Sequence, residues 1–161
     1  MLVLAAVLSA CASSPSPPVT SSASPPTTST TTTTTTLPPA SCVVSASEVA
    51  TAVGGHVLTP VAETVLKGSG CRFPFEGGGV VAVRVFGDGP AAFEKARTGL
   101  PDNVAVTGIG DEAIWSESVK ALHVLTAGKT LQVQVLVDDS APSRVAAEAL
   151  ARLVVPRVSG N

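Results

Sequence analysis

The strongest constraint on the fold is the position at which charged residues begin. All 10 Lys and Arg residues and all 12 Asp and Glu residues come after Cys42. The segment Ser13 to Ala40 consists mainly of Ser, Thr, Pro and Ala, with an unbroken threonine run over residues 30–36. Such a segment cannot bury enough apolar surface to offset the entropy lost on ordering it. We therefore expect a disordered linker over residues 11–40 and one globular domain over residues 41–161.

The linker composition also determines the distance between the start of the linker and the domain. A flexible coil of this length spans roughly 30 Å, and an extended polyproline-type chain spans roughly 90 Å. A Ser/Thr/Pro tract resembles an O-glycosylated stalk. An unmodified linker is the alternative.

The ten residues before the linker have the pattern of an export signal. Residues 1–7 are apolar, and the small residues Ser9 and Ala10 precede Cys11. The sequence Leu8-Ser9-Ala10-Cys11 resembles the lipobox of bacterial lipoprotein precursors. The resemblance implies cleavage before Cys11 and acylation of its thiol and new amino terminus, which together anchor a protein stably. No basic residue precedes the apolar run, so we expect basic residues to be encoded upstream of Met1. The alternative is a buried N-terminal strand or helix with an incidental cysteine.

The chain has three cysteines, and lipidation of Cys11 would leave Cys42 and Cys71 as a pair. In an oxidising compartment such a pair is expected to form a disulfide. Two free buried thiols are the alternative. A metal site is disfavoured, because His56 is isolated and no Cys-x-x-Cys motif or histidine pair accompanies the cysteines.

The first half of the domain shows one helical and several strand patterns. Ser45 and Glu48 have the spacing of a capping box, and Gly54 with Gly55 ends the helix that follows. A strand at a sheet edge is predicted within residues 57–65, and a hairpin within residues 71–86 around three glycines. We interpret Ser69, between two glycines, as part of a flexible turn.

The second half repeats this order. A helix is predicted to begin near Pro90, a strand follows over residues 113–115, and a hairpin is centred on Gly128 and Lys129 over residues 121–137. A final helix should be capped by Ser140 and limited by Pro156, with an inward stripe formed by Ala146, Ala149, Leu150, Leu153 and Val154. The expected fold is therefore α+β, a single domain with an antiparallel sheet and about three helices in the order helix, strands, helix, strands, helix.

The element order, the Cys42 and Cys71 pair, and the turn Gly108-Ile109-Gly110-Asp111-Glu112-Ala113 ahead of a hairpin resemble a group of small actinobacterial lipoproteins. Their α+β domain has no assigned role. The resemblance implies a location in the cell envelope, and it offers no catalytic residues to transfer to this chain.

Candidate catalytic residues are few. A nucleophile needs a base within hydrogen-bond reach, and the histidines are His56, in a turn region, and His123, in a strand. We expect His123 to lie on the polar face of its strand. The carboxylate pairs Asp111-Glu112 and Asp138-Asp139 lack the spaced ligands of a calcium loop, so turn formation or helix capping is the favoured interpretation. The sequence thus predicts no cofactor and no metal.

The aromatic content is low, with no Tyr, one Trp and four Phe. Stacking platforms for sugars or single-stranded nucleic acids are therefore not expected, and no basic face indicates nucleic acid. Trp115 is a possible interface anchor, with half-buried core as the favoured alternative.

These patterns together favour a membrane-anchored, extracytoplasmic lipoprotein. We expect a non-enzymatic binding or accessory module of the cell envelope whose partner is an unidentified envelope protein or ligand. One alternative is a small-ligand or lipid carrier, for which an apolar cavity would be the sign. Another is an envelope hydrolase or its regulator.

Overall fold

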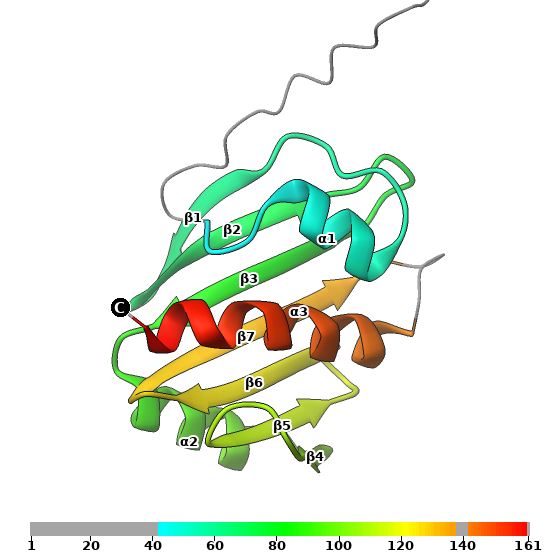
Figure 1. Ribbon diagram of the computed structural model, residues 1–161. Helices are drawn as coiled ribbons and strands as arrows, with labels where there is room; N and C mark the ends of the chain where they lie inside the picture. Colours follow the sequence, from blue (N-terminus) through cyan, green and yellow to red (C-terminus); the bar gives the residue numbers. More distant parts are fainter. Residues whose placement is uncertain (1–41, 138–141, 161) are drawn as a thin grey trace, which may run out of the picture. The chain divides into compact units, whose positions relative to one another are not determined.

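The computed structural model describes residues 42–137 and 142–160. Its helices are α1 (Ala46–Val53), α2 (Gly89–Gly99) and α3 (Ser143–Ser159). Its strands are β1 (Val61–Val65), β2 (Gly68–Pro74), β3 (Val80–Phe86), β4 (Asn103–Val106), β5 (Glu112–Ser116), β6 (Ala121–Thr126) and β7 (Lys129–Leu136). This order confirms the expected α+β class and the sequence helix, strands, helix, strands, helix (Figure 1).

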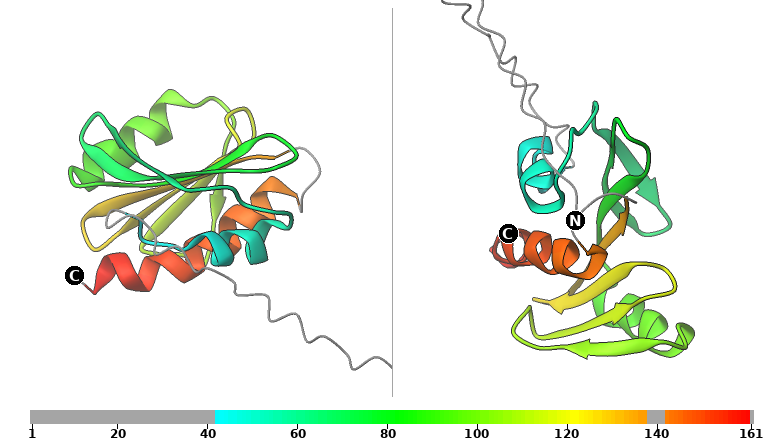
Figure 2. Two further views of the ribbon diagram at one scale, coloured as in Figure 1. Left: turned by 90° about the horizontal axis from the view of Figure 1, so that it is seen from above. Right: turned by 90° about the vertical axis from the view of Figure 1, so that its right-hand side faces the viewer.

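Within the described residues the strands form a single sheet in the order β1-β2-β3-β7-β6-β5-β4, and every neighbouring pair is antiparallel. After β3 the chain crosses through α2 to the far edge and returns strand by strand, so that β7 pairs with β3 at the centre. The edges are β1 and β4. Helices α1 and α3 cover one face of the sheet, and α2 lies against the other (Figure 2).

The main core lies between the sheet and the helices α1 and α3. Alternate residues of the central strands point toward these helices, as period-two alternation requires. The register aligns one buried row across the sheet, consisting of Cys71, Val83, Val133, Leu122 and Trp115. Helix α3 contributes Ala146, Ala147, Leu150, Ala151, Val154 and Val158 to the same core.

Strand β2 begins at Gly68, three residues earlier than the sequence pattern indicated. Ser69 lies inside β2, so its interpretation as part of a flexible turn is wrong. The flanking glycines are there because the strand packs closely on β3: a Cβ atom at Gly70 would lie 2.0 Å from the carbonyl oxygen of Val83. The glycines thus permit the close approach of two strands. In the sequence alone, such glycines cannot be told from those of a turn.

Helix α3 also differs from its prediction. It continues through Pro156 to Ser159, and buried Val158 holds the helix end against the core. Pro142 is the N-cap residue, and Ser140, which was expected to cap the helix, lies outside the described residues. Leu153 is 42% exposed and Ala149 is only partly buried, so neither belongs to the main core.

Strand β4 and the turn between β6 and β7 also differ from the sequence-based expectation. Strand β4 has four residues and an exposed pattern, which leaves too short an alternation to detect. The turn between β6 and β7 is centred on Ala127 and Gly128, with φ of 47° and 70°, one residue earlier than expected. Positive φ at both positions matches the right-handed twist of the flanking strands.

Candidate functional site

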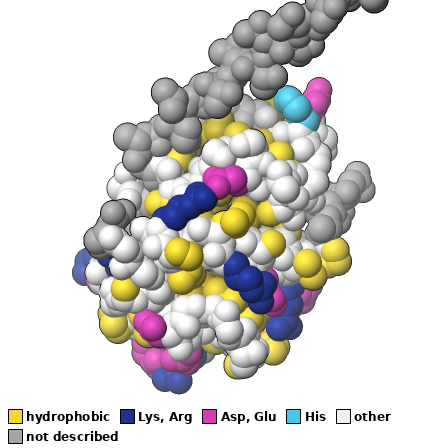
Figure 3. All heavy atoms as spheres, viewed as in Figure 1, with side chains coloured by type: hydrophobic (Ala, Val, Ile, Leu, Met, Phe, Trp, Pro, Cys, Tyr) yellow, Lys and Arg dark blue, Asp and Glu magenta, His cyan; other side chains and the backbone are white. Residues whose placement is uncertain are grey.

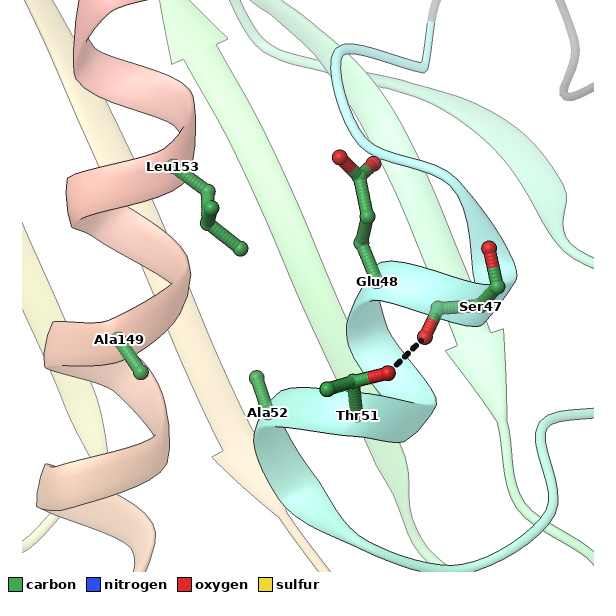
Figure 4. A pocket seen from close by; sticks show the side chains of 6 residues that line it. All are labelled: Ser47, Glu48, Thr51, Ala52, Ala149 and Leu153. Carbon is green, nitrogen blue, oxygen red and sulfur yellow. Dashed lines mark hydrogen bonds between the residues drawn. The ribbon is translucent and has the colours of Figure 1, made fainter.

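A groove lies between α1 and α3. It has a volume of about 580 Å³ and is open to solvent. Its lining comes from two helices far apart in sequence: Ser47, Glu48, Thr51 and Ala52 from α1, and Ala149 and Leu153 from α3 (Figure 4). Side chains of Ala52, Ala149 and Leu153 make its surface mainly apolar. Hydrophobic side chains reach the surface on the face that α1 and α3 form (Figure 3).

The capping box fixes the α1 side of this groove. The Ser45 amide donates to Glu48 Oε2 at 2.8 Å, and the Glu48 amide donates to Ser45 Oγ at 3.3 Å. This reciprocal arrangement satisfies two amides that a helix start leaves without partners. On the groove side Thr51 donates its hydroxyl to the Ser47 carbonyl at 2.8 Å, as drawn in Figure 4.

Glu48 also ties α1 to the end of α3. Arg157 Nη1 donates to Glu48 Oε2 at 3.1 Å and to the Val43 carbonyl at 2.9 Å, and its Nη2 contacts Glu48 Oε1. The Arg157 hydrogen bond, followed by that of the Ser45 amide, lowers the pKa of Glu48 to about 2. The same pairing raises the pKa of Arg157. The ion pair therefore connects Glu48, which lines the groove, to the last turn of α3.

A second polar cluster lies on the opposite face of the sheet, beside α2. Arg84 Nε donates to Glu63 Oε1 at 2.6 Å, and its Nη1 donates to Gln132 Oε1 at 2.9 Å. Gln134 accepts from the same Nη1 at 3.4 Å. The alternation of apolar and polar residues predicts that Arg84, Gln132 and Gln134 lie on the polar face of the sheet. Their contact with Glu63 depends on the strand register, which no sequence signal gives.

The two histidines lie in different environments. His56 is exposed, with Nδ1 3.5 Å from Glu76 Oε2 beyond the end of β2. His123 lies in β6 on the face expected from sequence but is buried, because α2 packs on that part of the sheet. Burial lowers the pKa of His123 to about 4, so its imidazole is neutral near neutral pH. Its Nε2 has no hydrogen-bond partner among the described residues.

Two of the aspartates, Asp111 and Asp102, have structural hydrogen-bond partners. Asp111 accepts from the Ala127 amide at 3.0 Å and so supports the β6–β7 turn, whereas Asp138 and Asp139 lie outside the described residues. Asp102, which the sequence analysis missed, accepts from the hydroxyl of Ser116 at 2.7 Å and from the amide of Ser118 at 2.6 Å. These bonds lower the pKa of Asp102, the Ser116 bond most.

Trp115 does not present a surface for a partner. Its side chain is 2% exposed and belongs to the core under α1 and α3, and its indole Nε1 donates to Glu117 Oε2 at 2.9 Å. The interface hypothesis for Trp115 is therefore wrong. The register places it opposite Leu122 on the buried face of the sheet, which explains the burial.

The cysteines of the domain are placed together. Cys42 precedes α1 and Cys71 lies in the middle of β2, and their Cα atoms are 5.3 Å apart, at disulfide-bonding distance. Such a bond links a residue before α1 to the middle of β2, the strand next to the β1 edge. Cys11 lies outside the described residues.

Among residues 42–137 and 142–160, no three His, Cys, Asp or Glu side chains are grouped so as to hold a metal ion. None of the helices in the described part of the chain is long and apolar enough to cross a bilayer. No family model, curated protein or solved structure matches the chain.

Proposed function

We propose that this chain is a bacterial lipoprotein, anchored through Cys11 to the extracytoplasmic face of the cell membrane. Its domain acts there by binding, as an accessory module of the envelope, without catalysing a reaction. The linker of residues 11–40 serves as the spacer between the anchor and the domain.

The observation that carries this proposal is the partition of the three cysteines. Cys42 and Cys71 lie at bonding distance in the folded domain. Disulfides persist in oxidising compartments outside the cytoplasm. The remaining cysteine, Cys11, is the one in the lipobox-like sequence Leu8-Ser9-Ala10-Cys11. The same partition thus supports both export and lipidation.

The histidine environments support a binding role over a hydrolytic one. A general base needs an accessible nitrogen within reach of a nucleophile or water. His123 is buried with its pKa lowered to about 4, and His56 stands in solvent beside Glu76. Substituting either histidine by alanine should leave the phenotype of a complemented deletion strain unchanged. Loss of function in a folded His123→Ala variant would favour the hydrolase alternative.

Metabolic labelling with an alkyne-bearing fatty acid tests the anchor. The full chain should be labelled in the producing cells and recovered with membranes, and Cys11→Ser should remove both properties. The control is the double variant Cys42→Ser, Cys71→Ser, which lacks the domain thiols and should keep the label. Labelling that survives Cys11→Ser, or depends on the domain cysteines, would overturn the proposal.

The apolar groove favours one second candidate, a carrier of a small apolar ligand. Its volume of about 580 Å³ is in the range of ligand pockets, and Ala52, Ala149 and Leu153 supply an aliphatic lining. Native mass spectrometry of protein isolated without detergent should then show a bound apolar molecule, absent from Leu153→Glu. The matched control is Val145→Glu, also an exposed aliphatic residue of α3 but outside the groove lining. Protein without ligand in every preparation would dismiss this candidate.

A further inference from the structure

The outer edge of β1 is an unprotected strand edge. β1 pairs with β2 and has no second strand beside it in the described part of the chain. Four of the large exposed hydrophobic residues gather along it: Leu58, Val61, Val65 and Leu66. Leu66, at the hairpin after β1, is 86% exposed and has φ of 54°, a conformation disfavoured for leucine. Exposed apolar side chains beside free backbone donors and acceptors form a template for another strand.

The charged residue within β1, Glu63, is turned away from this edge. Glu63, at the centre of β1, lies on a row with Gly70 and Arg84. Because Gly70 has no side chain, Glu63 extends over β2 to Arg84, 2.6 Å away, and only 16% of its side chain is exposed. Lys67, beside Leu66, pairs with Asp88 at 3.4 Å. Glu63 therefore stands at this edge as part of an ion pair rather than as a free carboxylate, whereas 78% of the Lys67 side chain is exposed.

The residue pattern of β1 is close to self-complementary in the antiparallel direction. A two-fold axis at Glu63 places Val61 opposite Val65 of a second copy, and Ala62 opposite Thr64 of that copy. β-Branched residues facing one another in this way stabilise paired strands. The same axis brings Leu66 of each copy toward the segment of the other that contains Leu58. The pairing then covers Val61 and Val65 of both copies.

We propose that the β1 edge binds a second copy of this chain, by antiparallel β1–β1 pairing about a two-fold axis at Glu63. Each copy offers the same patch, as a closed isologous dimer requires. One short strand per copy makes a contact below the standard size of stable interfaces, so the dimer is a weak one. The inference does not depend on the lipid anchor, since it rests on the domain alone.

Cysteine cross-linking tests the register of this pairing. Val61→Cys and Val65→Cys are prepared separately in the full chain carrying Cys11→Ser, with the Cys42 and Cys71 pair oxidised. Mild oxidation of the two variants mixed should give a dimer linking position 61 to position 65. The yield of dimer from the mixture should exceed that from either variant alone by about tenfold. In the proposed register position 61 of one copy faces position 65 of the other, so two cysteines at the same position are four residues apart and cannot bond.

Charged substitutions at the two sheet edges provide the control. Val61→Lys should abolish association in sedimentation experiments at high protein concentration, because it places an unpaired charge on the edge. Val104→Lys on the other edge strand, β4, should leave association unchanged; Val104 is 50% exposed and Val61 is 55% exposed. Monomeric wild-type protein at all concentrations, equal sensitivity to both lysines, or cross-linking only to a different polypeptide would each overturn the proposal.

Discussion

Replacing Glu48 with glutamine should weaken the connection between the start of α1 and the end of α3. The Glu48 carboxylate accepts from the Ser45 amide at 2.8 Å and from Arg157 Nη1 at 3.1 Å. Arg157 in turn donates to the Val43 carbonyl at 2.9 Å. Glutamine preserves the size of the side chain but removes its charge, so the variant isolates the electrostatic part of the contact.

The magnitude follows from the pKa of Glu48, which is about 2 in the folded protein against an ordinary value of 4.5. A difference of that size corresponds to at most about 3.4 kcal/mol. Since the side chains of Glu48 and Arg157 are 30% and 43% exposed, solvent screening reduces the expected contribution to about 1–2 kcal/mol. Because the folded-state pKa is the lower one, this stability is present above about pH 4.5 and is lost as the pH falls towards about 2.

Urea unfolding across this pH range, followed by the fluorescence of buried Trp115, measures the effect. Glu48→Gln should be less stable than the wild-type protein by about 1–2 kcal/mol near neutral pH, and the difference should disappear at about pH 2. The control is Glu94→Gln on α2, whose pair with Arg97 is 51% exposed on both sides and should contribute little. A pH-independent difference, or one no larger than that of the control, would refute the reasoning.

Three further predictions concern the disulfide, a glycine and a histidine. Cys71→Ala should lower the free energy of unfolding by up to about 3.5 kcal/mol, and non-reducing peptide mapping should find Cys42 linked to Cys71; two free thiols in fresh protein would contradict this. Gly70→Ala should lower the free energy of urea unfolding by at least about 2 kcal/mol, because its Cβ atom would meet a carbonyl oxygen of β3. As the control, Gly77→Ala has open space around the new Cβ atom and should lower it by under about 0.5 kcal/mol. Equal losses in the two variants would contradict the close approach of β2 to β3. NMR titration should show His123 protonating near pH 4, so that its burial costs stability progressively as the pH falls from 6.5 towards that value, and a pKa near 6.5 would refute its desolvation.

The helices and strands of this fold could be predicted from the sequence where residues close together in the chain determine them. The capping box at Ser45 and Glu48 marks the start of α1 because both halves of the motif lie within one turn. Alternation over residues 80–86 and 130–137 identifies the central strands, since a sheet with one buried face imposes period two. The class of the fold follows from the order of such local signals.

The errors arise where a residue's environment is set by distant parts of the chain. Leu153 was assigned to the core because it lies on the apolar stripe of α3, yet that edge of the helix faces the groove beside α1. Trp115 is buried because of its row in the sheet, and Ser69 lies in a strand because Gly70 packs on β3. Neither the register nor the helix placement is encoded within a short window.

The Glu63–Arg84 contact likewise could not be predicted from a short window of sequence. Its members are 21 residues apart and meet only because Gly70 separates their strands without a side chain. The groove likewise joins residues of α1 and α3 from opposite ends of the domain. Sequence motifs indicated the anchor and the cysteine pairing, whereas the surfaces available for binding required the structure.

The most direct test of the proposed anchoring is the mass of the N-terminal peptide of the mature protein, isolated from membranes of the producing cells. The proposal predicts a peptide that begins at Cys11 and carries the added mass of a diacylglyceryl group on its thiol. Further acylation of the amino terminus is compatible with it. A peptide that reads through Ala10 into an unmodified Cys11 would contradict the lipoprotein assignment.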